Sequence, residues 1–255
     1  METFRSGGLA IAYDDIGAGD AGCMVLVHGF ATNRAENWKR LGWYSACERA
    51  GYRLVALDLR GHGQSDKPHD AEAYGAEAMA GDVIGLIDHL NLRRVNLVGY
   101  SMGSHLSARI ALMAPERIDH LVLGGVGARL LHPEPSRDGM TMAQALRAAD
   151  PAAIADPILR GFRQFAENQG EDRLALAACG EGRGERLSET DLAAMRVPTL
   201  VVTGSRDDIA GDPQVLADAV PGAKCVTLPA CDHFTAIPHA LFKAAVFDFL
   251  EGWEE

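Results

Sequence analysis

The stretch Val95-Asn96-Leu97-Val98-Gly99-Tyr100-Ser101-Met102-Gly103 decides the fold of this chain. Its first four residues predict a short buried strand. Residues 104–114 predict a helix, which Pro115 terminates. Between them lies a Gly-x-Ser-x-Gly pattern, which is typical of a sharp strand-to-helix turn that exposes a serine hydroxyl. The first N–H groups of the helix bring partial positive charge under that hydroxyl. Ser101 is therefore a predicted nucleophile.

The composition limits the classes of function. The chain has 255 residues, enough for one large α/β domain, and its contents of 47% hydrophobic and 23% charged residues are ordinary for a soluble globular protein. A net charge of −11 argues against nucleic-acid and anionic-membrane partners, which need positive patches. The five scattered cysteines form no C-x-x-C pair and no metal-ligand cluster. With no apolar leader or membrane-length segment, we expect free thiols and a cytoplasmic protein.

Short apolar segments alternate with amphipathic ones along most of the chain. They predict strands at residues 9–13, 23–27, 54–57, 95–98, 121–123, 199–202 and 225–228, and further helices at 36–50, 76–90 and 242–250. This order is typical of an α/β fold with a mainly parallel sheet covered on both faces.

The region 128–195 interrupts this alternation. It predicts helical pieces at 142–148, 154–167, 173–178 and 189–195 and no strand. We therefore expect one domain, with a core formed by residues 1–127 and 196–255 and a helical cap inserted at 128–195.

A serine nucleophile needs a base within hydrogen-bond reach and an acid that orients the base. Both are expected in loops after later strands, in the order Ser, acid, His. His233 follows the last predicted strand directly and is the predicted base, whereas His239 is expected at the start of the final helix. Asp207 is the predicted acid, with Asp208 as the alternative, because the loop at 124–128 contains no carboxylate.

Negative charge that develops on a substrate oxygen needs two positioned N–H donors. The backbone N–H of Met102, directly after the nucleophile, is one predicted donor. The other is the backbone N–H of Phe30, in the loop after the strand at 23–27, where Gly29 allows close approach of the backbone. We expect His28 to brace this loop rather than to act as an acid or base.

Four blocks together resemble the α/β-hydrolase superfamily. They are VLVHGF (25–30), LDLRGHGQSDKP (57–68), LVGYSMGS (97–104), and VVTGSRDD (201–208) with CDHF (231–234). The resemblance implies an eight-stranded, mostly parallel sheet and no cofactor. It also implies a catalytic triad and an oxyanion hole, formed respectively by Ser101, Asp207 and His233 and by Phe30 and Met102.

Two residues depart from the usual pattern of this superfamily. Ser104 stands where many relatives have glycine, and Asp232 stands where glycine is usual before the histidine. An Asp232 carboxylate close to the imidazole of His233 would favour its charged form. Within the second block, Asp58 and Arg60 are expected to pin their loop rather than to contact substrate.

The serine at the turn excludes the superfamily branches that carry aspartate there, the haloalkane dehalogenases and epoxide hydrolases. Acyl transfer to water is then implied, and hydrolysis of a small carboxylic ester through an acyl-enzyme is the expected reaction. A C–C bond hydrolase or an enol-lactonase would use the same residues, and an aminopeptidase is a further alternative. A ligand-binding protein on the same fold, with little turnover, is an alternative from a different class.

The cap is expected to select the substrate. Its candidate substrate-binding residues are His132, Phe162 and Phe165, although helix packing explains the spacing of the two phenylalanines equally well. An aminopeptidase would need a cap acid such as Glu134, Asp138 or Glu167. Arginines that could meet an acidic substrate, but fit ordinary surface charge better, are Arg129, Arg137, Arg160 and Arg163. No metal site and no oligomeric state is predicted.

Overall fold

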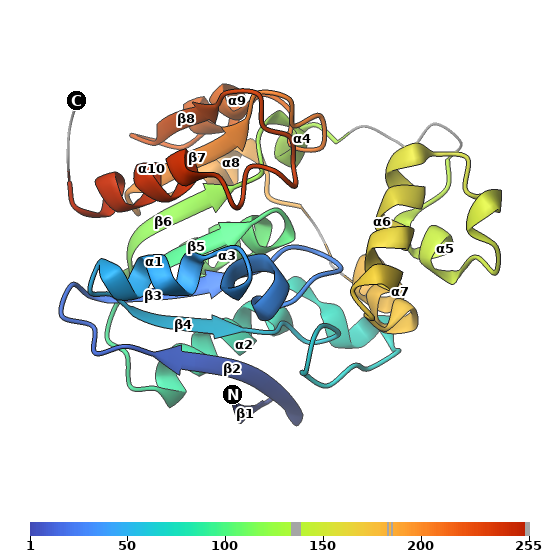
Figure 1. Cartoon of the computed structure of the whole chain (residues 1–255), viewed down its shortest axis with the longest axis horizontal. Coiled ribbons are helices and arrows are strands. Elements are labelled where there is room, and N and C mark those ends of the chain that lie inside the picture. Colours follow the sequence, from blue (N-terminus) through green and yellow to red (C-terminus); the bar gives the residue numbers. More distant parts are fainter. Residues whose placement is uncertain (134–138, 183, 185, 253–255) are drawn as a thin grey trace.

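Eight strands form one sheet in the computed structural model of the chain, which describes residues 1–133, 139–182, 184 and 186–252 (Figure 1). The strands are β1 (Glu2–Ser6), β2 (Leu9–Ile16), β3 (Cys23–Val27), β4 (Arg53–Leu57), β5 (Val95–Tyr100), β6 (Ile118–Gly124), β7 (Thr199–Gly204) and β8 (Lys224–Leu228). Their order is β1-β2-β4-β3-β5-β6-β7-β8. β2 is antiparallel to β1 and β4, and all other pairs are parallel. The predicted α/β fold with an eight-stranded, mostly parallel sheet is confirmed.

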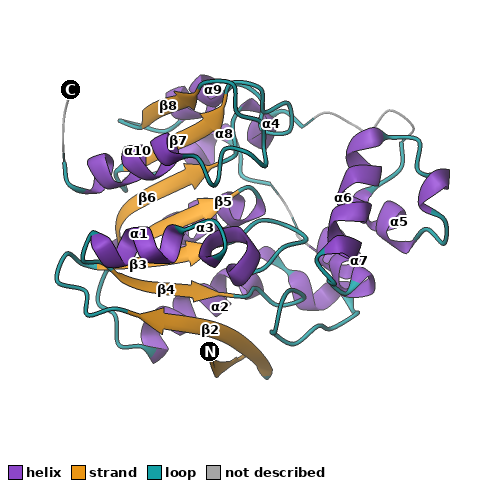
Figure 2. Ribbon diagram, viewed as in Figure 1, coloured by secondary structure: helices purple, strands orange, loops and turns teal. Residues whose placement is uncertain are grey.

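Helices cover both faces of the sheet and extend beyond one of its edges (Figure 2). The longer elements are α1 (Trp43–Arg49), α2 (Ala76–His89), α3 (Met102–Met113), α5 (Met142–Arg147), α6 (Pro157–Asn168), α7 (Arg173–Gly182), α9 (Pro213–Ala219) and α10 (Ala240–Leu250). The shorter ones are η1 (Ala35–Lys39), η2 (Ala71–Tyr74), η3 (Pro115–Arg117), α4 (Ala128–Leu131), η4 (Pro151–Ala153) and α8 (Glu189–Ala193).

The sheet separates two apolar layers, as successive residues of β3 illustrate. Val25 and Val27 belong to the cluster that packs under α2 and α3, whereas Met24 and Leu26 belong to the cluster under α1 and α10. All five residues of β3 are buried, as expected for a strand covered on both faces. Among the described residues, none of the helices has the length and hydrophobicity that crossing a bilayer requires.

The prediction of one continuous helix at 36–50 is wrong, because two separate helical elements occupy this segment. A π-helical turn, η1, ends at Lys39, and α1 begins at Trp43 after Gly42. Gly42 has φ of 79°, a left-handed conformation that suits glycine and interrupts a right-handed helix. The break lets Trp38 and Trp43 pack edge to face, with ring centroids 5.4 Å apart.

The carboxyl ends of β3, β5, β7 and β8 meet at one edge of the sheet, and the helices α5, α6 and α7 lie across from that edge (Figure 1). The loop after β4 is pinned at the same edge. The Arg60 guanidinium donates to both carboxylate oxygens of Asp82, and Asp58 accepts from the backbone N–H groups of Arg34 and Gln64. This is the bracing that the sequence predicts for Asp58 and Arg60.

Candidate active site

Ser101 lies in the turn between β5 and α3, in a strained backbone conformation with φ of 53° and ψ of −116°. Its N–H donates to Gly124 O of the neighbouring strand at 2.8 Å, which holds the turn in place. A Cβ atom at Gly99 would lie 2.5 Å from Gly103 O, and one at Gly103 would clash with Val27 O. Steric exclusion therefore accounts for both glycines, and the turn presents a half-buried serine hydroxyl.

The structure brings Ser101, His233 and Asp207 together in one hydrogen-bonded chain. His233 Nε2 lies 3.0 Å from Ser101 Oγ, and His233 Nδ1 lies 2.8 Å from Asp207 Oδ2. The second carboxylate oxygen of Asp207 accepts from the backbone N–H groups of Ile209 and Ala210. An ionised carboxylate only accepts, so Nδ1 carries the proton and Nε2 is free to accept the proton of Ser101.

Tyr100 fixes the segment that carries the histidine. Its buried hydroxyl donates to His233 O at 2.6 Å, and its ring lies 5.4 Å from the imidazole, centroid to centroid. Burial raises the pKa of Tyr100 well above its usual value, so the hydroxyl keeps the proton that it donates. His239, the other late histidine, caps the start of α10 by accepting from Leu241 N, as the sequence predicts.

The neighbouring residues Asp208 and Asp232 take no part in the hydrogen-bonded chain of Ser101, His233 and Asp207. Asp208 is exposed, directly after the buried Asp207. Asp232 Oδ1 accepts from Phe234 N, Thr235 N and Thr235 Oγ1, and these hydrogen bonds outweigh slight burial and lower its pKa. The unusual aspartate before the histidine therefore closes the turn in which His233 lies.

The loop after β3 approaches the serine closely. A Cβ atom at Gly29 would lie 3.5 Å from Ser101 Cβ, an ordinary van der Waals contact, so this backbone passes directly beside Ser101 and a small side chain would also fit there. Gly29 N–H donates to Asn37 Oδ1 at 3.3 Å. Phe30 follows in this loop, and Met102 begins α3 on the other side of Ser101. The two residues predicted as oxyanion donors therefore flank the nucleophile.

His28 braces this loop, as predicted. Its Nε2 accepts from Leu59 N at 3.0 Å, and its Nδ1 lies 2.7 Å from Gly29 O. Because Nε2 accepts, Nδ1 is the protonated nitrogen of a neutral ring. Burial lowers the pKa of His28, which agrees with that neutral form.

A cavity of about 220 Å³ opens at the serine and histidine. Its wall is largely aromatic and aliphatic, with contributions from the core and from α6 of the cap. The apolar members include Phe30, Leu41, Tyr100, Phe162, Phe165, Phe234 and Ile237. Phe162 and Phe165, predicted as substrate-binding residues, both line this cavity.

His132 does not line it, which corrects the prediction for this residue. The side chain is exposed and lies 3.8 Å from Glu189 Oε1. The preceding helix α4 is tied to the loop after β7, because Ala128 N donates to Asp212 O and Arg129 N donates to Ala210 O. This attachment leaves His132 at the surface.

Arg163 differs from the ordinary surface charge that the sequence favours for it. Arg163 is buried and donates to Ala145 O, Ala148 O and the carboxylate of Glu167, so it holds the cap together. Neither Glu167 nor Arg129 nor Arg160 lines the cavity at Ser101. The other charged residues considered from the sequence, Glu134, Arg137 and Asp138, lie outside the described residues.

Sequence reasoning missed several residues of the cavity wall. The CDHF block contains Phe234 without marking it as a wall residue, although its position beside the predicted base is a usable signal. Glu36, Asn37 and Arg40 come from η1 and the turn after it, and no pattern in that segment predicts a site. Within the described chain, no cluster of three or more His, Cys, Asp or Glu side chains is arranged to hold a metal ion.

The model of the alpha/beta hydrolase fold family matches residues 22–175, more than half of the chain. The chain belongs to this hydrolase family. The match confirms the resemblance drawn from the four sequence blocks, and the observed sheet agrees with it.

Two curated relatives cover almost the whole of this hydrolase. The acetyltransferase component of an acetoin cleaving system from Pseudomonas putida is 29% identical over 248 residues, 92% of this chain and 64% of the relative. This hydrolase thus spans less than two thirds of that relative's length. A 2-hydroxy-6-oxononadienedioate/2-hydroxy-6-oxononatrienedioate hydrolase from Paraburkholderia xenovorans is 29% identical over 273 residues, 96% of this chain and 91% of the relative.

A solved structure gives the corresponding three-dimensional likeness. The enol-lactonase from Burkholderia xenovorans LB400 superimposes on this hydrolase with a TM-score of 0.78. It is 25% identical in sequence, and the match covers 98% of this chain and 100% of the lactonase. The three proteins carry different names, one of them that of an acetyltransferase component. The family match therefore identifies this chain as a hydrolase, and its substrate is left to be inferred from the site.

Proposed function

We propose that this hydrolase cleaves a small carboxylic ester, or a related acyl bond, with Ser101, His233 and Asp207 as its catalytic triad. The observation that carries the proposal is the chain of 3.0 and 2.8 Å contacts from Ser101 Oγ through His233 to Asp207. A base at hydrogen-bond distance activates the serine, and the carboxylate orients the base and stabilises the charge that it gains.

The proposed reaction follows from these positions. His233 Nε2 takes the proton of Ser101 as Oγ attacks the carbonyl carbon, and the same imidazole then protonates the departing alcohol. The backbone N–H groups of Phe30 and Met102 are the proposed oxyanion hole. Water attacks the acyl-enzyme in the second half of the reaction, with His233 again as base, and releases the acid.

The nature of the cavity supports an ester over more highly charged substrates. Much of its wall is apolar, and the positive charge among its described lining residues is that of Arg40. Arg40 is paired with Glu36 at 3.1 Å and is largely exposed. The likeness to an enol-lactonase points in the same direction, because a lactone is a cyclic ester.

A C–C bond hydrolase is the second candidate, and the relative from Paraburkholderia xenovorans favours it. That relative is named for dioate compounds, which carry two carboxylates. The same triad could serve such a substrate, but the described residues that line the cavity at Ser101 offer little unpaired positive charge to bind two carboxylates. A dioate of this kind, tested beside simple esters, separates the two candidates.

We propose a small-molecule substrate and no nucleic-acid or membrane partner, which the net charge of −11 supports. The region 128–195 is proposed as the cap insertion. A cytoplasmic location is supported by the five cysteines, all of them described, since no two of them form a disulfide.

The test is hydrolysis of para-nitrophenyl acetate and butyrate by the wild type and by Ser101→Ala. We expect turnover by the wild type and a loss of about four orders of magnitude or more in the variant, which should keep its thermal stability. Ser45→Ala, at an exposed position in α1, is the matched control and should retain full activity. A phosphonate reagent should add its mass at Ser101 alone.

Equal hydrolysis by the wild type and Ser101→Ala would overturn the triad assignment. Stabilisation by a ligand with negligible turnover of esters and dioates would instead support a binding protein on this fold.

A further inference from the structure

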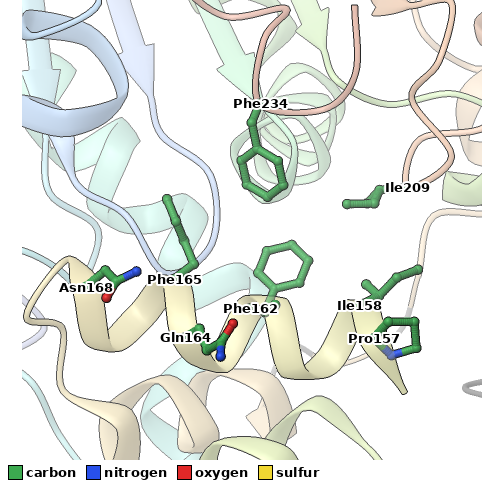
Figure 3. A pocket seen from close by; sticks show the side chains of 9 residues that line it. Pro157, Ile158, Phe162, Gln164, Phe165, Asn168, Ile209 and Phe234 are labelled. Carbon is green, nitrogen blue, oxygen red and sulfur yellow. The ribbon is translucent and has the colours of Figure 1, made fainter. Parts of the chain in front are cut away.

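A second and larger cavity, of about 560 Å³, adjoins the cavity at Ser101. The two cavities have three lining residues in common, namely Phe162, Phe165 and Phe234. Figure 3 shows the outer cavity, with Phe162 and Phe165 rising from α6 and Phe234 facing them from the core. The outer cavity is therefore separated from the nucleophile by aromatic side chains rather than by backbone.

Phe234 forms the central part of this partition. Its ring centroid lies 5.6 Å from that of His233, 5.5 Å from that of Phe165 and 6.2 Å from that of Phe162. The side chain is nevertheless 47% exposed. A ring with almost half of its surface exposed can rotate or be displaced at little cost, because packed atoms cover only part of it.

The outer cavity has a largely apolar wall. Pro157, Ile158, Phe162 and Phe165 follow one face of α6, and Ile209 contributes from the loop after β7 (Figure 3). Ile158 is 48% exposed, so a large apolar side chain beside the cavity is left in contact with water. Contiguous exposed apolar surface of this kind marks a binding site for an apolar group.

We propose that the outer cavity binds the linear hydrocarbon chain of the substrate, and that Phe234 is the partition that such a chain displaces. This inference rests on the proposed function and extends its substrate class from small esters to esters with a chain of about eight carbons or more. The occupant is a chain of the substrate rather than a second protein, because the cavity continues into the catalytic one beside His233.

The volumes explain why a long chain would use both cavities. The inner cavity, at about 220 Å³, is less than half the size of the outer cavity, at about 560 Å³. A short ester fits there, and further methylenes must enter the outer cavity or stay in water. Each methylene moved from water to an apolar site favours binding by about fourfold. A rise in kcat/KM with chain length beyond about six carbons is therefore expected.

Gly161 allows the outer cavity to be filled without disturbing the inner one. Of the two cavities it lines the outer one alone, and among the described residues no atom outside the adjoining part of α6 lies within 4 Å of a Cβ built at this position. Gly161→Phe therefore places a ring in open space within α6. Gly81→Phe is the matched control, because Gly81 lies in α2, lines neither cavity and also has open space around its Cβ position.

The experiment measures kcat/KM for para-nitrophenyl butyrate, octanoate and dodecanoate. In Gly161→Phe we expect the ratio of dodecanoate to butyrate to fall by about tenfold or more, since several methylenes lose their site. Gly81→Phe should keep the wild-type ratio. Phe234→Ala should raise the ratio, because the partition is removed.

A parallel series of alkyl acetates, from ethyl to dodecyl, shows whether the chain belongs to the acid or to the alcohol. Sensitivity of only one series to Gly161→Phe identifies that part of the ester as the occupant, and either result supports the inference. If neither series responds while Ser101-dependent hydrolysis is present, the inference is wrong and the proposed function stands.

Direct binding separates the inference from catalysis. Calorimetric titration of dodecanoate into Ser101→Ala should give saturable binding, and the added Gly161→Phe substitution should weaken it by about tenfold or more. This result would support the cavity assignment even if no ester were hydrolysed. Equal binding to both proteins, or a dimer that Gly161→Phe dissociates in sedimentation velocity, would overturn it.

Discussion

Glu171 and Asn33 join the segment between α6 and α7 to the loop after β3, since Glu171 Oε1 accepts a hydrogen bond of 2.9 Å from Asn33 Nδ2 across 138 residues of sequence. The other carboxylate oxygen accepts from Gly63 N at 2.9 Å. Asn33 belongs to the loop after β3 that carries Phe30, and Gly63 belongs to the loop after β4. One buried carboxylate thus fastens the segment between α6 and α7 to two loops beside the candidate active site.

The first prediction concerns the pH dependence of stability at Glu171. Burial raises the pKa of its carboxyl above the ordinary 4.5. The unfolded chain has the ordinary pKa, and the folded protein has the raised one. At a pH between the two, the folded protein holds a proton that the unfolded chain has released. The contribution of Glu171 to stability therefore falls as pH rises. Glu171→Gln does not titrate. The free energy of unfolding of the wild type minus that of the variant should therefore decrease from about pH 4 to about pH 7.

Urea denaturation at a series of pH values measures this difference. Glu116→Gln, at an exposed position, should give a difference that varies less with pH. A difference between wild type and Glu171→Gln that grows as pH rises would contradict the prediction.

The adjacent aspartates Asp207 and Asp208 offer a matched pair for catalysis. Asp207→Asn should lower kcat for a short ester by about 10⁴-fold, because an amide favours the wrong tautomer of His233. Asp208→Asn should have no measurable effect, since its side chain is exposed and lies outside the hydrogen-bonded chain. Steady-state kinetics on both variants, with circular dichroism to verify folding, make the comparison. Equal losses would refute the choice of Asp207.

The glycines Gly103 and Gly161 should respond to alanine in opposite ways. Gly103→Ala places a methyl group against the backbone of Val27 and His28 and should destabilise the fold by about 3 kcal/mol or more. Gly161→Ala meets no atom within 4 Å and should stabilise α6 by about 0.5 to 1 kcal/mol. Thermal unfolding of the two variants measures both effects. A harmless Gly103→Ala would show that the turn after β5 is less tightly packed than described.

The buried pair Arg60–Asp82 should matter far more for stability than the exposed pair Arg40–Glu36. Removal of one partner leaves the other charge buried, so Asp82→Ala should cost about 3 to 5 kcal/mol. Arg40→Ala should cost less than about 1 kcal/mol, because Arg40 is 74% exposed. Chemical denaturation compares the two variants. Similar costs would mean that the Asp82 site admits water in solution.

Much of the core follows from local patterns in the sequence. The strand predicted at 23–27 is β3 without change, and the strand at 95–98 lies within β5, because largely apolar runs are needed where helices cover both faces. The division of the helix at 36–50 was missed. It depends on the left-handed conformation of Gly42, and a glycine inside an amphipathic pattern does not by itself reveal its φ value.

The residues of the candidate site were likewise predictable only in part. Ser101, Asp207 and His233 were brought together from their positions after three strands, since parallel strands end at a common edge. The cavity wall depends on how α6 and the loop after β8 face one another, which is a tertiary relationship. For that reason Phe234 was overlooked, and His132 was placed in a pocket that it does not line.

The order of the strands has a consequence for how such a protein can diverge. Ser101, Asp207 and His233 follow β5, β7 and β8, which lie within one run of four neighbouring strands, whereas the cap helices enter the chain between β6 and β7. The spacing of the three side chains is therefore set by the sheet and not by the length of the inserted segment. Evolution can lengthen, shorten or exchange that segment, and so alter which molecules are accepted, while the arrangement of the reacting atoms is inherited intact.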